Sequence, residues 1–317
     1  MKNLPDIQKS NEGFKKIPID KVGVRNIKIP LVLSRKDSNE PFHTIATVSS
    51  YCDLVEDVKG INMSRIGRTI FEELKENSEK IRRFEDLKNF VKKLKEAHNT
   101  DNIYIKIKFP FIYKNVTPIT NIESYENVDV EFETTLIGDE LRNYIKVKAI
   151  EMALCPCSKE MSSLMNNITH DELNEIIKLS RPLKDKISKA GFGAHNQKSE
   201  IEVKVETNGI VYIEDLIELI KKGASSPTWS ILKRPDEKYV TEISYMGGYF
   251  DENKKYIKVP NSGPKFVEDI SRDIAHLLNE LLDNKIKDYI IIVNNQESIH
   301  SSDIMATSIL SCGRNLR

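Results

Sequence analysis

The sequence of 317 residues predicts an α+β protein built from two similar modules in tandem, each with an antiparallel sheet and paired helices on one face. Two observations lead to this prediction. Segments in which apolar and polar residues alternate, as in β-strands, flank segments with the apolar periodicity of amphipathic helices. This order occurs in the first half of the chain and recurs in similar form in the second half. One α+β domain with a coincidental order of elements is the alternative.

The first module is expected to span residues 1–140 in the order β-β-α-α-β-β. Within the predicted helix that follows the second strand, Ile66, Ile70 and Leu74 lie three to four residues apart and so share one face. The predicted elements, in chain order, are strands at 22–33 and 42–54, helices at 64–76 and 84–97, and strands at 102–111 and 127–138.

The second module is expected to span residues 141–317, with the junction near residues 138–143. Two polar stretches, 164–190 and 247–263, are expected to be insertions between elements of this module, the first of them on the surface. The predicted elements are strands at 143–154, 199–207 and 288–295 and helices at 212–223 and 264–283.

Acidic and basic residues balance at 48 each, which gives no electrostatic reason to expect nucleic acid or an anionic membrane as a partner. No apolar run approaches the roughly 20 residues needed to cross a bilayer, and the first residues lack the apolar core of a signal peptide. A cytoplasmic protein is therefore expected, and its four cysteines are expected to be thiols.

Cys155 and Cys157 lie in the stretch LCPCSKEMSS, where they could form a disulfide, bind a metal, supply a nucleophile or only pack. A reducing compartment disfavours the disulfide, and four cysteines without any C-x-x-C spacing do not make a site of four thiolates. A mixed catalytic site remains, in which a histidine and a carboxylate join the thiolate. Buried structural thiols are the alternative.

Two of the six histidines, His195 and His300, lie in loops beside predicted strands, where a scaffold commonly positions functional groups. The choice among carboxylates is left open by chemistry alone. Those in two polar stretches near the predicted helices of the second module are candidates: Asp236, Glu237, Glu242, Glu268 and Asp269.

The sequence contains no glycine-rich phosphate-binding loop and no nucleophile elbow. Phosphate groups would therefore have to be bound by individual side chains. Ser64 and Arg65 are candidates because they lie at a predicted helix start, where free N–H groups favour anions. An ordinary N-cap explains these two residues equally well.

Six blocks in this order resemble the type B GTP cyclohydrolase I family: KGINMSR, LCPCSKEMS, GAHNQKS, LKRPDEKYVTE, PKFVED and NNQESIH. The resemblance extends over nearly the whole chain. It implies the tunnelling fold, with two such modules fused in each chain, and a homotetramer with active sites near the subunit interfaces.

The resemblance also implies a site for a divalent metal ion, which would be zinc, manganese or ferrous iron. Matched block by block, its ligands would be Cys155, His195, Glu237 and His300. Cys155 and His300 would thereby be catalytic, and His300 and Cys157 are candidates for moving protons. Packing beside the metal site is an equal alternative for Cys157.

Glu268 resembles the residue of this family that binds guanine. A carboxylate can accept two hydrogen bonds from the N1–H and 2-amino edge of guanine, a donor pair that adenine lacks. By the same resemblance, Lys233, Arg65 and Ser64 would contact the rest of the substrate.

The implied reaction converts GTP and water to formate and 7,8-dihydroneopterin 3′-triphosphate, the first step toward tetrahydrofolate or 7-deazaguanine compounds. One alternative is a cyclohydrolase that gives the 2′,3′-cyclic phosphate. Another is a catalytically silent purine-binding relative, because Asn62 and Ser302 occupy positions where relatives usually carry histidine.

Overall fold

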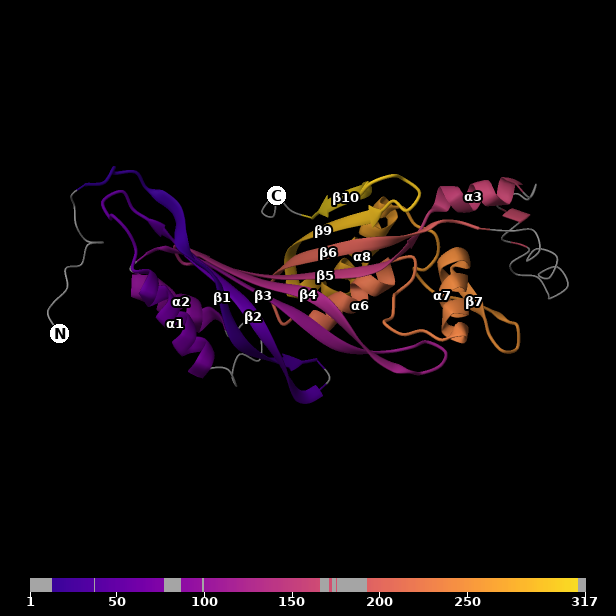
Figure 1. The fold of residues 1–317 in the computed structure, drawn as a ribbon, viewed down its shortest axis with the longest axis horizontal. Helices are drawn as coiled ribbons and strands as arrows, with labels where there is room; N and C mark the ends of the chain where they lie inside the picture. The colour runs from indigo at the N-terminus through magenta and orange to yellow at the C-terminus, as the bar shows by residue number, and fades with distance from the viewer. Residues whose placement is uncertain are drawn as a thin grey trace.

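The computed structural model describes residues 13–36, 38–76, 87–98, 100–165, 171–172, 175 and 193–312 (Figure 1). Within this part of the chain, eight strands form one antiparallel sheet in the order β1-β2-β3-β4-β5-β6-β9-β10. The strands are β1 (Ile19–Arg35), β2 (Ser38–Leu54), β3 (Asn102–Val116), β4 (Glu123–Ile137), β5 (Glu140–Leu154), β6 (Asn196–Thr207), β9 (Ile286–Gln296) and β10 (Met305–Ser311).

One face of the sheet is apolar and the other is charged, because successive side chains of a strand point to opposite faces. The register aligns buried apolar residues of neighbouring strands, as in the row Val48, Ile107, Phe132, Ile145 and Val205. The next row on the opposite face contains lysines and glutamates. There Glu131 pairs with Lys108 at 3.2 Å and with Lys106 at 2.9 Å.

Amphipathic helices cover the apolar face of the sheet. The helices α1 (Met63–Glu76) and α2 (Leu87–His98) lie against strands of the first half, and α6 (Ile213–Gly223) and α8 (Val267–Leu282) lie against strands of the second half. A short 3₁₀ helix, Asp283–Lys285, follows α8. The helices bury Ile and Leu side chains, each of which stabilises the fold by about 1.5–3 kcal/mol.

Gly223 at the end of α6 allows the close contact between α6 and α8. A Cβ atom at this position would lie 2.3 Å from Ile274 Cγ1, which is far shorter than a van der Waals contact. The pair of helices therefore packs more closely than any larger residue at this position would permit.

The structure confirms the predicted fold class, an α+β protein with helices on one face of antiparallel strands. The strands of the two halves join in a single sheet through the pairing of β4 with β5, whose turn lies at residues 138–139. The expected junction near residues 138–143 coincides with this turn. The division into modules at residue 140 stays a prediction.

Apart from the short strands within the expected insertion at 247–263, the elements that were not predicted from the sequence are α3 (Pro156–Met165), α7 (Arg234–Met246) and β10. In α7, all of whose residues are described, the buried ones are Asp236, Ile243 and Ser244. Most side chains of β10 are exposed or half-buried. Elements with so few buried apolar residues show little of the periodicity on which sequence analysis depends.

Of the two expected insertions, residues 164–190 lie mostly outside the described residues. The other, 247–263, contains a hairpin of β7 (Gly248–Phe250) and β8 (Tyr256–Lys258). The hairpin packs on α7, where the rings of Tyr239 and Tyr249 meet edge to face at 4.8 Å between centroids. In the described part of the chain, no helix has the length and apolar character needed to span a membrane.

Candidate active site

Cys155 lies where β5 ends and α3 begins. Its Sγ accepts a hydrogen bond from Ser158 N at 3.4 Å, and its carbonyl oxygen accepts one from Lys159 N at 3.2 Å. Cys155 therefore occupies the N-cap position of α3, where the sulfur accepts from a free N–H group of the first turn. All four cysteines of the chain are free thiols in the structure, as expected, and Cys157 is exposed in the first turn of α3.

His195 lies beside Cys155, because β5 and β6 pair up to Leu154 and Asn196. Cys155 N donates to His195 O at 3.2 Å, and His195 N donates to Ser158 Oγ at 3.2 Å. The structure thus brings together two of the four predicted metal ligands, although they are 40 residues apart in the sequence.

The loop between β9 and β10 contains His300 and lies against His195. Ser298 Oγ lies 3.3 Å from His195 Nδ1, and Gln197 Nε2 donates a hydrogen bond to Glu297. His300 itself is exposed, and its backbone N donates to Glu297 O at 3.3 Å. The loop of His300 is therefore attached to His195 through the side chain of Ser298.

Glu237 is exposed in the first turn of α7. Helix α7 meets α3 near its other end, where Lys159 Nζ lies 5.1 Å from the ring centroid of Tyr245. In the residues that the structure describes, no three His, Cys, Asp or Glu side chains are arranged to hold a metal ion. The structure thus joins Cys155 with His195 but does not gather all four predicted ligands.

Asp236, next to Glu237, is completely buried. Burial opposes ionisation of this carboxyl group, but hydrogen bonds from Thr120 Oγ1 and from the backbone N–H groups of Thr120, Lys233 and Ile119 outweigh it and lower the pKa of Asp236 to about 2. Lys233, one of the predicted substrate contacts, is exposed at the N-cap of α7.

Glu268 is exposed in the first turn of α8, and the start of this helix lies beside the end of β5. Lys265 N donates to Leu154 O at 3.1 Å, so the segment before α8 adjoins the residue that precedes Cys155. The buried Lys265 side chain donates to Gly223 O at 2.7 Å and pairs with Asp273 at 2.7 Å. Burial lowers the pKa of Lys265. No role was predicted for this lysine from the sequence.

Ser64 and Arg65 lie in the first turn of α1, at the opposite end of the molecule from α3 and α7 (Figure 1). Both are exposed, and Ser64 Oγ donates to Asn62 Oδ1 at 2.5 Å. Arg65 N donates to Asn62 O at 3.0 Å. Within one chain these two predicted substrate contacts are therefore remote from Cys155.

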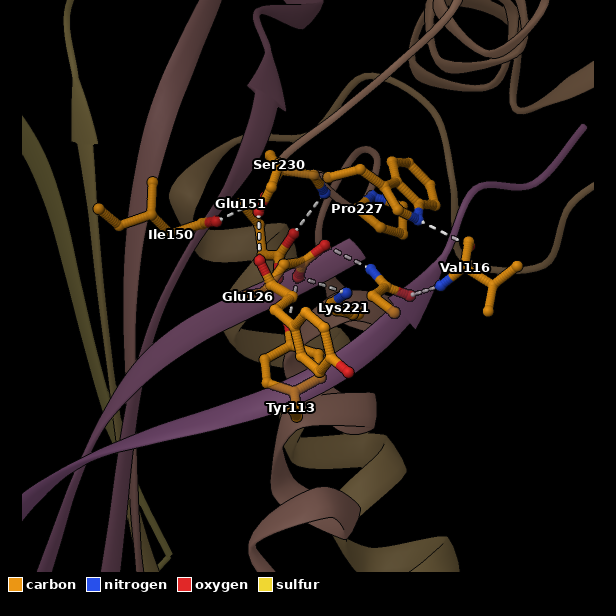
Figure 2. A network of polar contacts seen from close by, with 12 residues as sticks. Tyr113, Val116, Glu126, Ile150, Glu151, Lys221, Pro227 and Ser230 are labelled. Atoms are coloured by element: carbon orange, nitrogen blue, oxygen red, sulfur yellow. Dashed lines mark hydrogen bonds and ion pairs between the residues drawn. The ribbon is translucent and has the colours of Figure 1, made fainter. Parts of the chain in front are cut away.

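A second polar cluster, which the sequence analysis missed, lies under the loop between α6 and α7 (Figure 2). Lys221 pairs with Glu126 at 2.9 Å, and Tyr113 donates a hydrogen bond to the same carboxylate. Glu151 on β5 accepts from Thr228 N at 2.7 Å. Its position in the alternating pattern of β5 places it on the apolar face of the sheet, and this was the available signal.

Glu151 is 1% exposed, and burial raises its pKa to about 8. Nearby Glu126 raises it further, whereas Lys221 and the hydrogen bonds from Thr228 oppose the shift. The cluster borders a cavity of about 300 Å³ that is also lined by Trp229 and Ser230. The carboxyl group of Glu151 is thus protonated and uncharged at neutral pH.

The architecture is that of a tunnelling-fold protein. A solved structure with the same fold is uricase from Arthrobacter globiformis, which aligns over 94% of both chains with a TM-score of 0.51 and 8% identity. A likeness at this level of identity shows the fold alone.

Sequence comparison identifies the family. Residues 4–306 match the family model of type I GTP cyclohydrolase folE2. Two relatives named GTP cyclohydrolase FolE2 are similar over 96% of both chains: that of Thermosipho africanus is 34% identical and that of Fervidobacterium nodosum is 33% identical. The chain therefore belongs to the type I GTP cyclohydrolase FolE2 family.

Proposed function

We propose that this protein hydrolyses GTP to formate and 7,8-dihydroneopterin 3′-triphosphate with the help of a divalent metal ion. Family membership supports a GTP cyclohydrolase. The structural observation that carries the proposal is the backbone hydrogen bond between Cys155 N and His195 O, because it places a cysteine and a histidine from two of the family blocks side by side. Such a pair fits a mixed metal site with an exchangeable position.

The donor chemistry of this end of the molecule fits zinc, manganese or ferrous iron. Ser298 contacts Nδ1 of His195, which orients the ring and leaves Nε2 for a metal ion. Glu237, at the end of α7 away from its contact with α3, and the exposed His300 would have to move toward Cys155 and His195 to complete the set. When bound, the ion would supply Lewis acidity that activates water for attack at guanine C8.

In this proposal Glu268 binds the guanine edge, which requires a carboxylate free of other strong partners. Its exposure in the first turn of α8 satisfies this requirement. Cys157 is exposed two residues after Cys155, and His300, itself one of the proposed ligands, is exposed in the loop between β9 and β10. Their exposure suits the proposed proton transfer at N7, N9 and the ribose oxygen.

Replacing Glu268 with Gln should lower kcat/KM for GTP by about 10²-fold, mainly through a higher KM. The amide has one acceptor oxygen, so its NH₂ group would face the donors of guanine and leave one of them without a partner. Steady-state formate release measures the effect. Glu280→Gln, the same change at an exposed position farther along α8, is the matched control and should behave as wild type. Equal KM values for the two variants would refute the assignment of Glu268.

Ser64 and Arg65 can contact a substrate at Cys155 only if a second copy of the chain supplies them, because they lie at the opposite end of the molecule. We therefore propose a homo-oligomer with composite sites, which agrees with the homotetramer that the family resemblance implies. Exposed Arg65 would bind the triphosphate, and the N-terminus of α1 would add its free N–H groups.

Mixing two inactive variants tests the composite site. Cys155→Ala and Arg65→Ala should each lose most activity, and mixed oligomers formed by refolding them together should recover about a quarter of wild-type activity. The recovery arises because one site in four would combine an intact Cys155 with an intact Arg65. Formate release from the mixture, compared with the separate variants, is the measurement. Activity that stays at the level of the separate variants would show that each site lies within one chain.

Mass spectrometry of the reaction product distinguishes the proposed triphosphate from a 2′,3′-cyclic phosphate. The blocks CPCSKE and AHNQKS favour the triphosphate. Binding of GTP without any product would instead indicate a catalytically silent relative. Asn62 and Ser302, which replace the usual histidines, are the basis of that alternative.

A further inference from the structure

The carboxylate of Asp236 joins two segments that are 116 residues apart in the sequence. It accepts hydrogen bonds from Ile119 N and Thr120 N, both at 3.0 Å, and from Thr120 Oγ1 at 2.5 Å. It also accepts one from Lys233 N at 3.1 Å, which caps the start of α7. The residue is completely buried, so these donors replace water around an ionised group.

The partner segment is the tip of the β3–β4 hairpin, which Figure 1 shows next to one end of α7. Its turn is held by Thr117, whose N donates to Ile122 O at 3.0 Å and whose Oγ1 accepts from Ile122 N at 2.9 Å. Thr117 Oγ1 also lies 2.9 Å from Thr120 Oγ1. The tip thus presents fixed donors to the carboxylate, which favours a single arrangement of the pair.

Helix α7 is held at its first turn differently from its second half, which contacts the β7–β8 hairpin and α3. Apart from Asp236, its buried residues are Ile243 and Ser244, both in its second half, and every residue of this helix is described. The first turn is therefore held mainly by the buried carboxylate. Neighbouring residues of a helix point about 100° apart, so the orientation of Asp236 fixes the direction in which Glu237 leaves the helix. The hydrogen bond from Lys233 N to the same carboxylate fixes the backbone of Lys233.

The start of α6 has a similar capping carboxylate and serves as a comparison. There Asp215 accepts a hydrogen bond from Tyr212 N at 3.2 Å and pairs with Lys36 at 2.7 Å, so it caps its helix in the same way. Helix α6 has a long buried face that includes Leu216, Ile217 and Ile220. Asp215 thus has the capping role without any predicted site residue on its helix.

We propose that Asp236 is a positioning residue, which fixes the first turn of α7 on the tip of the β3–β4 hairpin and so fixes the points of the backbone from which Glu237 would reach the metal ion and Lys233 the substrate. This inference rests on the proposed function, because it assigns Glu237 and Lys233 to that site. It adds the β3–β4 hairpin tip as a part of the site that touches neither metal nor substrate.

The test compares Asp236→Asn with Asp215→Asn, using zinc alone as the probe. In Asp236→Asn the amide NH₂ cannot accept from Lys233 N or Thr120 Oγ1 as the carboxylate does. We expect its zinc Kd, measured by competition with a chromophoric chelator, to rise about tenfold or more. Asp215→Asn should lower the melting temperature but leave the zinc Kd within about twofold of wild type.

Two further variants keep the test decisive if Asp236→Asn folds poorly. Thr120→Val removes one donor to the carboxylate and should raise the zinc Kd. Thr120→Ser retains the hydroxyl and should keep the zinc Kd of the wild type. Amide hydrogen exchange should accelerate together at Ile119, Thr120 and the first turn of α7 in Asp236→Asn, and not in Asp215→Asn.

An unchanged zinc Kd in both Asp236→Asn and Thr120→Val would overturn the inference, even if stability falls. Zinc binding by the wild type without GTP turnover would refute the proposed function but leave the inference standing if the variants bind zinc more weakly. If the wild type binds no zinc, manganese or ferrous iron, both proposals fail.

Discussion

Replacing Cys155 with serine should abolish formate release and strip the protein of most of its metal while leaving the fold intact. The serine hydroxyl can still accept from Ser158 N, so α3 keeps its N-cap. A neutral hydroxyl is a far poorer metal ligand than a thiolate. We expect kcat/KM to fall on the order of 10³-fold or more, which corresponds to about 4 kcal/mol of transition-state stabilisation.

Metal analysis and formate release on the same preparation measure this prediction. Cys312→Ser is the matched control, because Cys312 is an exposed free thiol at the end of β10 and should tolerate the change. Cys157→Ser separates the two cysteines of the C-x-C pair: retained metal with reduced turnover would indicate a role in proton transfer. A Cys155→Ser protein that keeps its metal and its activity would contradict the assignment of Cys155.

The free energy of unfolding should fall as the pH rises from about 5 to 8, in a way that depends on Glu151. Burial keeps this carboxyl group protonated in the folded protein up to a pKa of about 8, from an ordinary value of 4.5. In this window unfolding releases a proton, because the unfolded chain ionises Glu151 and the folded protein does not. The contribution of neutral Glu151 to stability is therefore fully present below the pKa of this group in the unfolded chain. It is lost as the pH rises through the pKa of Glu151 in the folded protein.

The size of the effect follows from the shift, since one pKa unit is worth about 1.4 kcal/mol. Ionisation of Glu151 inside the fold should thus lower the free energy of unfolding by about 5 kcal/mol at most. Glu151→Gln is neutral at every pH and keeps an oxygen that can accept from Thr228 N. Relative to wild type, the variant should gain stability steadily as the pH rises.

Urea unfolding of wild type and Glu151→Gln at pH 5, 6.5 and 8 checks this expectation. Glu202→Gln, on the charged face of the sheet where Glu202 pairs with Lys146, is the control and should keep the wild-type pH slope. Parallel pH profiles for wild type and Glu151→Gln would show that Glu151 is ionised inside the fold.

Alternation and helical periodicity were sufficient to predict the fold class, because the buried face of nearly every strand and long helix is apolar. They did not reveal α7, since its first turn is anchored by the carboxylate of Asp236 rather than by apolar side chains. The signal for this role lies in the β3–β4 hairpin, far away in the sequence, and no local pattern connects the two segments.

For the site, the family blocks supplied the candidate residues, and their roles stay a prediction. Cys155 and His195 adjoin because their strands pair to the last residue, which follows from the register of β5 and β6. The location of Ser64 and Arg65 at the other end depends on the length and twist of the sheet, which residue spacing does not specify. The burial of Glu151 could have been predicted, because it is a charged residue at a position of β5 that faces the apolar side of the sheet.

The most direct test of the central claim uses GTP labelled with ¹³C at C8 of the guanine ring. Incubated with wild-type protein and zinc, manganese or ferrous iron, it should give labelled formate together with an unlabelled pterin in equal amounts. Label that remains in the purine with every one of these metals would contradict the proposal that this chain is a GTP cyclohydrolase.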